Sequence, residues 1–244
     1  MKPFLFLGAR PEDTVADEEY SALLRFGCLQ PGELRRVRLD SAPLPELDLS
    51  QFSGIILGGS PFTSSDPPAR KSPTQLRVEA ELSGLLDTVV DADFPFFGAC
   101  YGVSTLGLHQ GGAVDRRFGE PVGEVEVILA DGAARDPMLA GVPSRFAAFV
   151  GHKEGCSRLP AGAELLARSD RCPVQMFRLK KNLYATQFHP ELDVKGLITR
   201  IYAYRHAGYF PPQQAEEIIA LVRGSHITIP QLILRNFVTR YARD

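Results

Sequence analysis

A cysteine at the end of a predicted buried strand is the residue of this chain best placed to do chemistry. The apolar run 94–97 leads into the sequence GACYG, which sets Cys100 between small residues. Small flanking residues permit a tight turn from strand to helix, where the central side chain projects near the helix's free N–H groups. We expect a thiol there to lose its proton more easily than a free cysteine, as a nucleophile requires. Taken alone, the pattern also fits a cysteine that fills space in a core.

A histidine and a glutamate form a second candidate group in the sequence QFHPEL. Pro190 disfavours a helical conformation of His189, and residues two apart in an extended segment point the same way. Glu191 is therefore placed to orient the imidazole and to leave its second nitrogen for a thiol elsewhere, the arrangement of a nucleophile–base–carboxylate triad. The alternative is a strand-end histidine beside a surface glutamate.

A glycine pair ends another predicted strand. Gly58 and Gly59 follow the apolar run 55–57. Because no side chain blocks the approach, a backbone N–H there can stabilise a developing oxyanion, although an isolated glycine pair is more often a plain turn. Three strand ends thus carry an N–H donor, a thiol and a histidine–glutamate pair. Open α/β sheets form their sites at the carboxyl ends of their strands, so we expect these groups to meet.

Strands and helices alternate in the part of the chain that must position these groups. Predicted strands lie at 4–7, 34–39, 55–57 and 94–97, and predicted helices at 17–26, after Ser72-Pro73, and at 101–108. This alternation predicts an α/β fold with a doubly wound, mostly parallel sheet flanked by helices.

The later segments differ in character. Short predicted strands at 124–129, 145–150 and 164–169 indicate a small antiparallel addition beside the main sheet. Two amphipathic segments, PPQQAEEIIALVRG and IPQLILRNFVTRYARD, predict a C-terminal helical extension. We expect residues 1–195 to form one domain, with residues 196–244 packed on it.

Composition restricts the partners. The 244 residues are 44% hydrophobic and 23% charged, with a formal net charge of −2. Without a dense run of Lys or Arg, a nucleic-acid partner is not expected. No stretch is long and apolar enough for a signal peptide or a membrane span, so we expect a soluble, cytoplasmic protein. The four cysteines match no zinc spacing, and we expect neither a metal nor a cofactor.

These stretches together resemble the class I (triad) glutamine amidotransferases, most of all the glutaminase part of GMP synthase. The resemblance rests on GIILGGSP, PFFGACYGVSTLGLHQGGAV and CPVQMFRLKKNLYATQFHPEL. The stretch FVGHKEGCSRLPAGAELLARSD is similar to the family's Ser-His-Gly-Asp segment and the strand after it. The resemblance covers roughly residues 4 to 195, with these motifs in the family's order.

The resemblance implies roles for five residues. Cys100 would be the nucleophile, His189 the general base and acid, and Glu191 the orienting carboxylate. The backbone N–H groups of Gly59 and Tyr101 would form the oxyanion hole. The implied reaction is attack on a γ-carboxamide carbon, release of ammonia or an amine, and hydrolysis of a glutamyl thioester.

The sequence departs from the family at two places that would touch the substrate. Val103 and Ser104 stand where the family has a glutamine-containing pair, and a serine hydroxyl donates one hydrogen bond rather than two. Ser104 is therefore a candidate substrate contact, with the preference for free glutamine left open. His152 is equally suited to face the ligand or to serve the structure, and Lys153 adds a charge with no evident target.

Three functions fit these motifs. The first is a glutaminase that supplies ammonia to a synthetase on a partner protein, since the chain has no P-loop. The second is a free-standing hydrolase of γ-glutamyl amides or peptides, a small-molecule substrate class that needs no partner. The third is a binding or regulatory module that kept the fold without the activity, which the presence of Cys100, His189 and Glu191 argues against.

Overall fold

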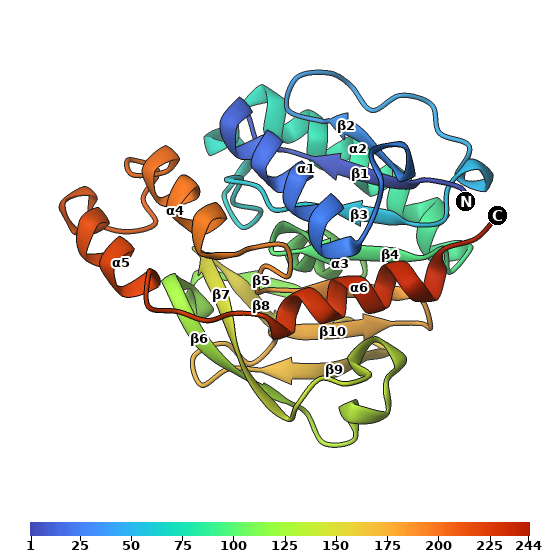
Figure 1. Ribbon diagram of the computed structural model, residues 1–244. Coiled ribbons are helices and arrows are strands. Elements are labelled where there is room, and N and C mark those ends of the chain that lie inside the picture. Colours follow the sequence, from blue (N-terminus) through green and yellow to red (C-terminus); the bar gives the residue numbers. More distant parts are fainter.

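A nine-stranded sheet forms the centre of the computed structural model, which describes residues 1–244 (Figure 1). Its strand order is β2-β1-β3-β4-β11-β10-β9-β6-β7. Five neighbouring strands are parallel: β2 (Leu34–Arg38), β1 (Phe4–Gly8), β3 (Ile55–Leu57), β4 (Phe96–Ala99) and β11 (Leu183–Thr186). The other four are antiparallel to their neighbours: β10 (Met176–Leu179), β9 (Ala163–Arg168), β6 (Glu120–Leu129) and β7 (Arg145–His152).

Helices cover both faces of the parallel half. α1 (Asp13–Gly27) and α6 (Ile229–Tyr241) pack on one face, and α2 (Pro73–Asp91) and α3 (Tyr101–His109) on the other. The side chains of β1 explain this division, because Phe4 and Phe6 join the core under α1 and α6 while Leu5 and Leu7 join the core under α2. Successive residues of a strand point to opposite faces, so an uninterrupted apolar run requires cover on both sides.

The predicted α/β fold is confirmed, with one refinement to the antiparallel part. Strands β6, β7, β9 and β10 extend the main sheet itself, and a separate two-stranded sheet pairs β5 (Ala113–Asp115) with β8 (Gly155–Arg158). Only three residues connect β10 to β11, and a connection this short joins antiparallel neighbours. No helix is both long and apolar enough to cross a bilayer.

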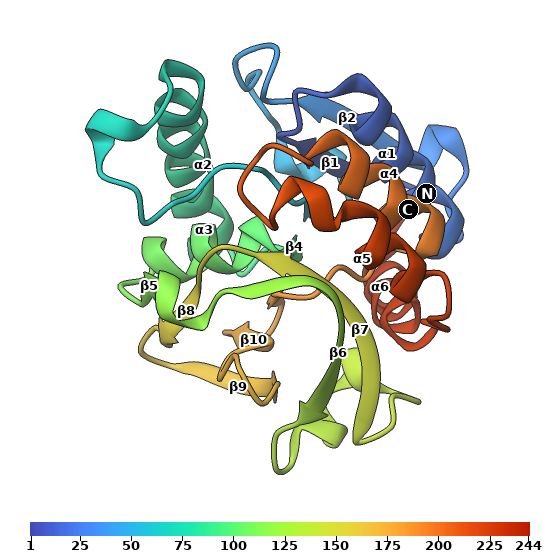
Figure 2. The ribbon, with the colours of Figure 1, turned by 90° about the vertical axis from the view of Figure 1, so that its left-hand side faces the viewer.

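The C-terminal region contains one helix that the sequence analysis did not identify. α4 (Val194–Ala203) begins at Asp193, whose side chain accepts a hydrogen bond from the Gly196 N–H. It packs with α5 (Ala215–Val222) beside β6 and β7 (Figure 2). The domain boundary expected after residue 195 falls in the first turn of α4, and the division at that residue remains a prediction.

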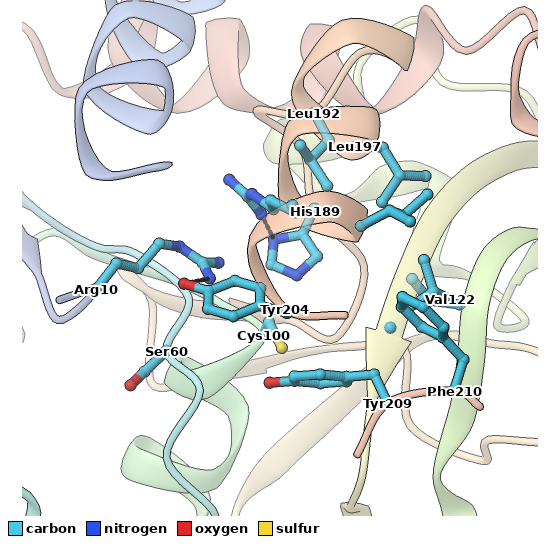
Figure 3. A pocket seen from close by; sticks show the side chains of 14 residues that line it. Arg10, Ser60, Cys100, Val122, His189, Leu192, Leu197, Tyr204, Tyr209 and Phe210 are labelled. Carbon is cyan, nitrogen blue, oxygen red and sulfur yellow. Dashed lines mark hydrogen bonds between the residues drawn. The ribbon is translucent and has the colours of Figure 1, made fainter. Parts of the chain in front are cut away.

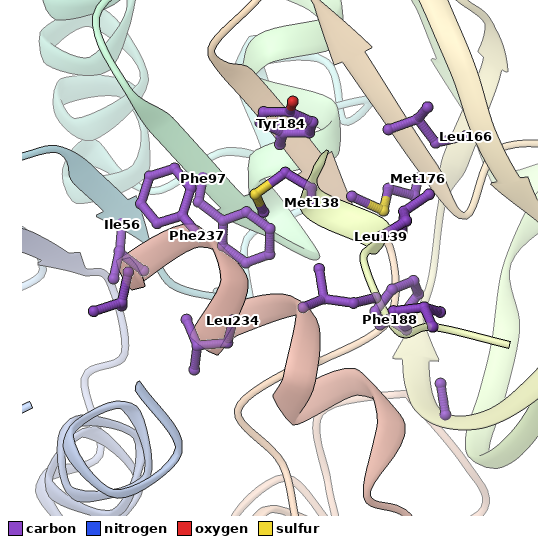
Figure 4. Close-up of a cluster of buried hydrophobic side chains, with 14 of the residues drawn as sticks. Ile56, Phe97, Met138, Leu139, Leu166, Met176, Tyr184, Phe188, Leu234 and Phe237 are labelled. Atoms are coloured by element: carbon purple, nitrogen blue, oxygen red, sulfur yellow. The ribbon is translucent and has the colours of Figure 1, made fainter. Parts of the chain in front are cut away.

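The last helix completes the core of the first strands. The ring of Phe237 on α6 lies 5.8 Å from that of Phe4 and 5.3 Å from that of Phe97 (Figure 4). Ile233 and Leu234 of the same helix are fully buried beside them. Residues from both ends of the chain therefore share one hydrophobic cluster.

The turn from β4 into α3 is sharp and strained. Cys100 has φ 52° and ψ −83°, a conformation that costs a non-glycine residue on the order of 1–3 kcal/mol. Its N–H donates to the Thr186 carbonyl of β11 at 2.6 Å, which holds the turn against the neighbouring strand. A Cβ on Gly98 would lie 2.7 Å from the Cα of Gly102, so only glycine lets the two sides of the turn approach.

We predict that Gly98→Ala destabilises the protein. The added methyl group meets backbone, which cannot move aside as a flexible side chain would, and overpacking of this kind costs about 1–3 kcal/mol. Urea or thermal unfolding measures the change. The control is Gly84→Ala in α2, where a Cβ meets nothing within 4 Å and alanine favours the helix. Equal stability of Gly98→Ala and wild type would contradict the steric argument.

Candidate active site

Two neighbouring strands bring the predicted cysteine and histidine together. β4 and β11 are parallel, with Ala99 opposite Thr186, so Cys100 and His189 follow the same edge of the sheet. Both side chains line one pocket, where the imidazole of His189 is directed toward the thiol (Figure 3).

Glu191 orients the histidine from behind. Its Oε1 atom lies 2.8 Å from Nδ1 of His189, and both residues are buried. A ring that donates its Nδ1–H to this carboxylate has Nε2, on the side that faces Cys100, free to accept a proton. The expected extended conformation of this segment is wrong: Pro190 and Glu191 form a turn in which the Leu192 N–H donates to the His189 carbonyl at 3.3 Å, and this turn brings the two side chains together.

Arg200, which the sequence analysis did not single out, joins this pair from α4. Its Nη2 donates to Oε1 of Glu191 at 2.9 Å, and its Nη1 lies 3.0 Å from Nδ1 of His189. Burial lowers the pKa of His189, and the Arg200 charge acts in the same direction against the attraction of Glu191. For Glu191, burial alone would raise the pKa, but its interactions with His189 and Arg200 outweigh this effect and hold the pKa well below its usual range. The site therefore contains a neutral imidazole and an ionised carboxylate at neutral pH.

The protonation of Cys100 is opposite to the expectation from the turn alone. Burial in the pocket raises the pKa of the Cys100 thiol to about 12, although the charges of Arg10 and Arg200 act to lower it. The expected easy loss of the proton is thus wrong for the unliganded protein, because desolvation of the thiolate outweighs the favourable charges. The resting pair is a neutral thiol and a neutral imidazole, so the base must remove the proton during attack.

The two expected oxyanion donors differ in their hydrogen bonding. Tyr101 opens α3, so its N–H is one of the first four in the helix, which have no partner inside it. The N–H of Gly59 instead donates to the buried carboxylate of Glu19 at 3.3 Å. A Cβ at Gly59 would collide with the Arg10 guanidinium and lie 2.8 Å from Cε1 of His189, which explains the glycine.

Arg10 and Glu19 complete a buried charge network beside this edge. Arg10 follows β1, and its Nε donates to Oε1 of Glu19 at 3.0 Å while its Nη1 donates to the hydroxyl of Tyr204 at 3.2 Å. Arg200 contacts the same Glu19 oxygen at 3.3 Å. One feature of the sequence could have pointed to Arg10, because it is a charged residue just after the end of a buried strand. Glu19 and Arg200 carried none, because each lies on an ordinary amphipathic helix.

A second pocket lies on the other side of Cys100 and contains Ser104. The Ser104 hydroxyl donates to the Tyr101 carbonyl at 3.0 Å and accepts from the Ser64 hydroxyl at 2.9 Å. Glu154 of this pocket accepts from the N–H groups of Ser64 and Ser65. Ser104 is therefore placed beside the nucleophile as expected, with its hydrogen bonds made to protein atoms.

His152 lines the same pocket but directs both ring nitrogens into the protein. Nδ1 lies 2.8 Å from the Glu154 carbonyl, and Nε2 lies 2.8 Å from the carboxylate of Glu120. Both ring nitrogens therefore have partners within the protein. Cys172 lies in the same cluster, with ligand-type atoms of all three residues within 4.8 Å of one another. In this structure the His152 ring supports the pocket wall rather than facing its interior.

Two further contacts near Cys100 were not expected. Gln187 directly follows β11, and its Nε2 atom lies 3.8 Å from the Cys100 sulfur. The charge of Lys153 has a target on the chain itself, because Nζ donates to the Ala207 carbonyl at 3.3 Å and lies 4.6 Å from the ring centre of Tyr209. Both contacts depend on segments that are distant in the sequence.

Comparison with known proteins identifies relatives along most of the chain. The family described as glutamine amidotransferase class-I matches residues 24–201. A GMP synthase (glutamine-hydrolyzing) from Xylella fastidiosa strain M12 is 36% identical over 146 residues, which are 57% of this chain and 25% of that protein. One from Xanthomonas oryzae pv. oryzae strain PXO99A is 37% identical over 145 residues, with the same shares. The chain thus spans about a quarter of the length of these curated relatives.

Solved structures share the whole fold. A glutamine amidotransferase from Thermotoga maritima superposes with a TM-score of 0.77 at 18% identity, covering 99% of this chain and 98% of that one. A glutamine amidotransferase from Methylobacillus flagellatus gives a TM-score of 0.73 at 18% identity, covering 100% and 97%. With the family match over residues 24–201, the chain belongs to the class I glutamine amidotransferases, a family of cysteine-dependent, glutamine-hydrolysing enzymes.

Proposed function

We propose that this chain cleaves the γ-carboxamide of glutamine or of a γ-glutamyl compound with Cys100, His189 and Glu191. The observation that carries the proposal is the 2.8 Å contact between Nδ1 of His189 and Oε1 of Glu191, with the opposite side of the ring facing Cys100. This arrangement supplies a nucleophile, a base and the group that fixes the base's tautomer.

The chemistry follows from the neutral resting pair. Nε2 of His189 takes the thiol proton as the Cys100 sulfur forms a bond to the carboxamide carbon, and the carbonyl oxygen becomes an oxyanion. The C–N bond then breaks as His189 returns the proton to the departing nitrogen, leaving a glutamyl thioester. Water, deprotonated by His189, attacks the thioester, and glutamate leaves as the thiol is restored.

The oxyanion has one donor ready in Tyr101, whose N–H opens α3. For Gly59 to act as the second donor, its N–H has to leave the carboxylate of Glu19 as substrate enters. Arg10 and Arg200 add positive charge on the same side, which favours both the thiolate and the oxyanion. Ser104 and the wall built by His152 would contact the glutamyl part in the second pocket.

The remaining alternatives differ in what happens to the released nitrogen. A synthetase partner for ammonia remains a prediction, as does a cytoplasmic location, and the GMP synthase relatives suggest only the kind of partner. A free-standing γ-glutamyl hydrolase uses the same three residues with water. An inactive binding module is disfavoured by the intact geometry of Cys100, His189 and Glu191.

We predict that Cys100→Ala abolishes amide hydrolysis. Removing the nucleophile of a triad lowers kcat by about a thousandfold or more. Ammonia and glutamate are measured with glutamine and with a panel of γ-glutamyl amides. The matched control is Cys28→Ala, which removes an exposed thiol that is distant from Cys100 in the sequence and should leave turnover unchanged. A wild type that never exceeds the Cys100→Ala background on any substrate would overturn the proposed hydrolase.

We predict that Cys100 alkylation keeps accelerating into the alkaline range. Because burial raises the thiol pKa to about 12, its thiolate fraction still increases between pH 8 and 10, where a free cysteine of pKa about 8.5 levels off. The rate of iodoacetamide labelling at Cys100 is followed by mass spectrometry in Cys28→Ala protein. Exposed Cys28, in Cys100→Ala protein, is the comparison thiol. A plateau already at neutral pH would instead indicate a preformed thiolate–imidazolium pair.

A further inference from the structure

Two pockets with different linings meet at Cys100. Ser60, Cys100 and Tyr209 line both pockets, so the two pockets adjoin at the thiol. One contains Ser104, Glu154 and Gln187 and is called the Ser104 pocket. The other contains His189 and is called the His189 pocket (Figure 3). The contrast between them bears on which part of a substrate each can hold.

The His189 pocket has an apolar wall built from three parts of the chain. Val122 and Val150 come from the β6–β7 pair, Leu197 and Ile201 from α4, and Phe210 from the segment that follows it. Arg10 and Arg200 lie at its inner end, each paired with a buried carboxylate. The space beside the histidine therefore suits an uncharged apolar group better than a cation.

The proposed reaction places the leaving group in the His189 pocket. His189 has to give its proton to the departing nitrogen, so the leaving group lies on the side of the histidine. The glutamyl part, which stays on the sulfur, then occupies the Ser104 pocket. Ammonia is small and polar and gains nothing from an apolar wall, whereas an alkyl or aryl group does.

The segment that follows α4 forms another side of the His189 pocket. The segment 204–210 supplies Tyr204, Tyr209 and Phe210 to its lining. Lys153 holds this segment through the Ala207 carbonyl and the Tyr209 ring. A leaving group in this pocket would therefore also contact the aromatic side chains of this segment.

Resting on the proposed hydrolysis, we infer that the substrate is a γ-glutamyl amide whose nitrogen carries an apolar alkyl or aryl group. Cleavage breaks its C–N bond, His189 protonates the nitrogen, and the free amine leaves from the His189 pocket. Water then releases glutamate from Cys100. The amine and glutamate are the two products.

The test compares three substrates through one readout. Glutamine, γ-glutamyl-isopentylamide and γ-glutamyl-(4-aminobutyl)amide all give the same glutamyl thioester, so differences in kcat/KM for glutamate release report substrate binding and the steps up to departure of the amine. The second and third have substituents of similar length, one apolar and one cationic. We expect kcat/KM for the isopentylamide to exceed both others by about tenfold or more. Equal or better use of glutamine, or of the aminobutyl amide, would overturn the inference.

Variants at Val122 locate the effect. Val122→Phe fills the pocket, and Val122→Thr keeps its shape while adding a hydroxyl. Both should lower the ratio of kcat/KM for the isopentylamide to kcat/KM for glutamine about tenfold. The matched control is Val194→Phe, since Val194 is also half-buried against the same hydrophobic cluster but does not line the pocket. Equal losses on both substrates would contradict a leaving-group pocket.

The outcomes distinguish a failure of the substrate inference from a failure of the proposed hydrolysis. Cys100-dependent release from glutamine without any preference for the isopentylamide would leave the hydrolase intact and overturn the inference alone. No Cys100-dependent release from any of the three substrates would overturn both.

Discussion

Four buried charges at one edge of the sheet hold the whole site together. Arg10 and Arg200 each reach a glutamate that is almost fully buried, Glu19 and Glu191. Removing one partner of such a pair costs about 3–5 kcal/mol, because the other charge is left uncompensated away from water. The network ties the end of β1 to α1, α4 and the segment after β11. The orientation of the histidine and the state of the Gly59 N–H both depend on it.

The site residues that could be found from the sequence are those whose geometry depends on residues close by in the chain. His189 and Glu191 are two positions apart, and Cys100 lies within its own strand–turn–helix, so short stretches contain the geometry. Arg200 becomes their neighbour only through the packing of α4. The pKa of Cys100 was predicted in the wrong direction because the sequence shows the helix that follows the thiol but not the protein atoms that desolvate it.

The fold was predictable for the same reason. Alternating strands and helices fix the doubly wound sheet, since apolar runs such as 55–57 need cover on both faces. Two of the C-terminal helices, α5 and α6, were also evident, but α4 and its effect on the site were not. The segment 204–210 has no regular pattern, and its contact with Lys153 spans more than fifty positions. Long-range contacts of side chains, unlike periodicity, leave no trace in a single sequence.

The packing of α6 has a consequence for how the chain acquires its structure. The apolar faces of β1 and β4 close only against Phe237 and its neighbours, which the ribosome makes after every strand of the sheet. Until then this face of the sheet stays exposed, with the aggregation risk of any unfinished hydrophobic surface. Contacts between such distant positions also raise the contact order, which slows folding. We expect nascent chains that still lack α6 to need a chaperone.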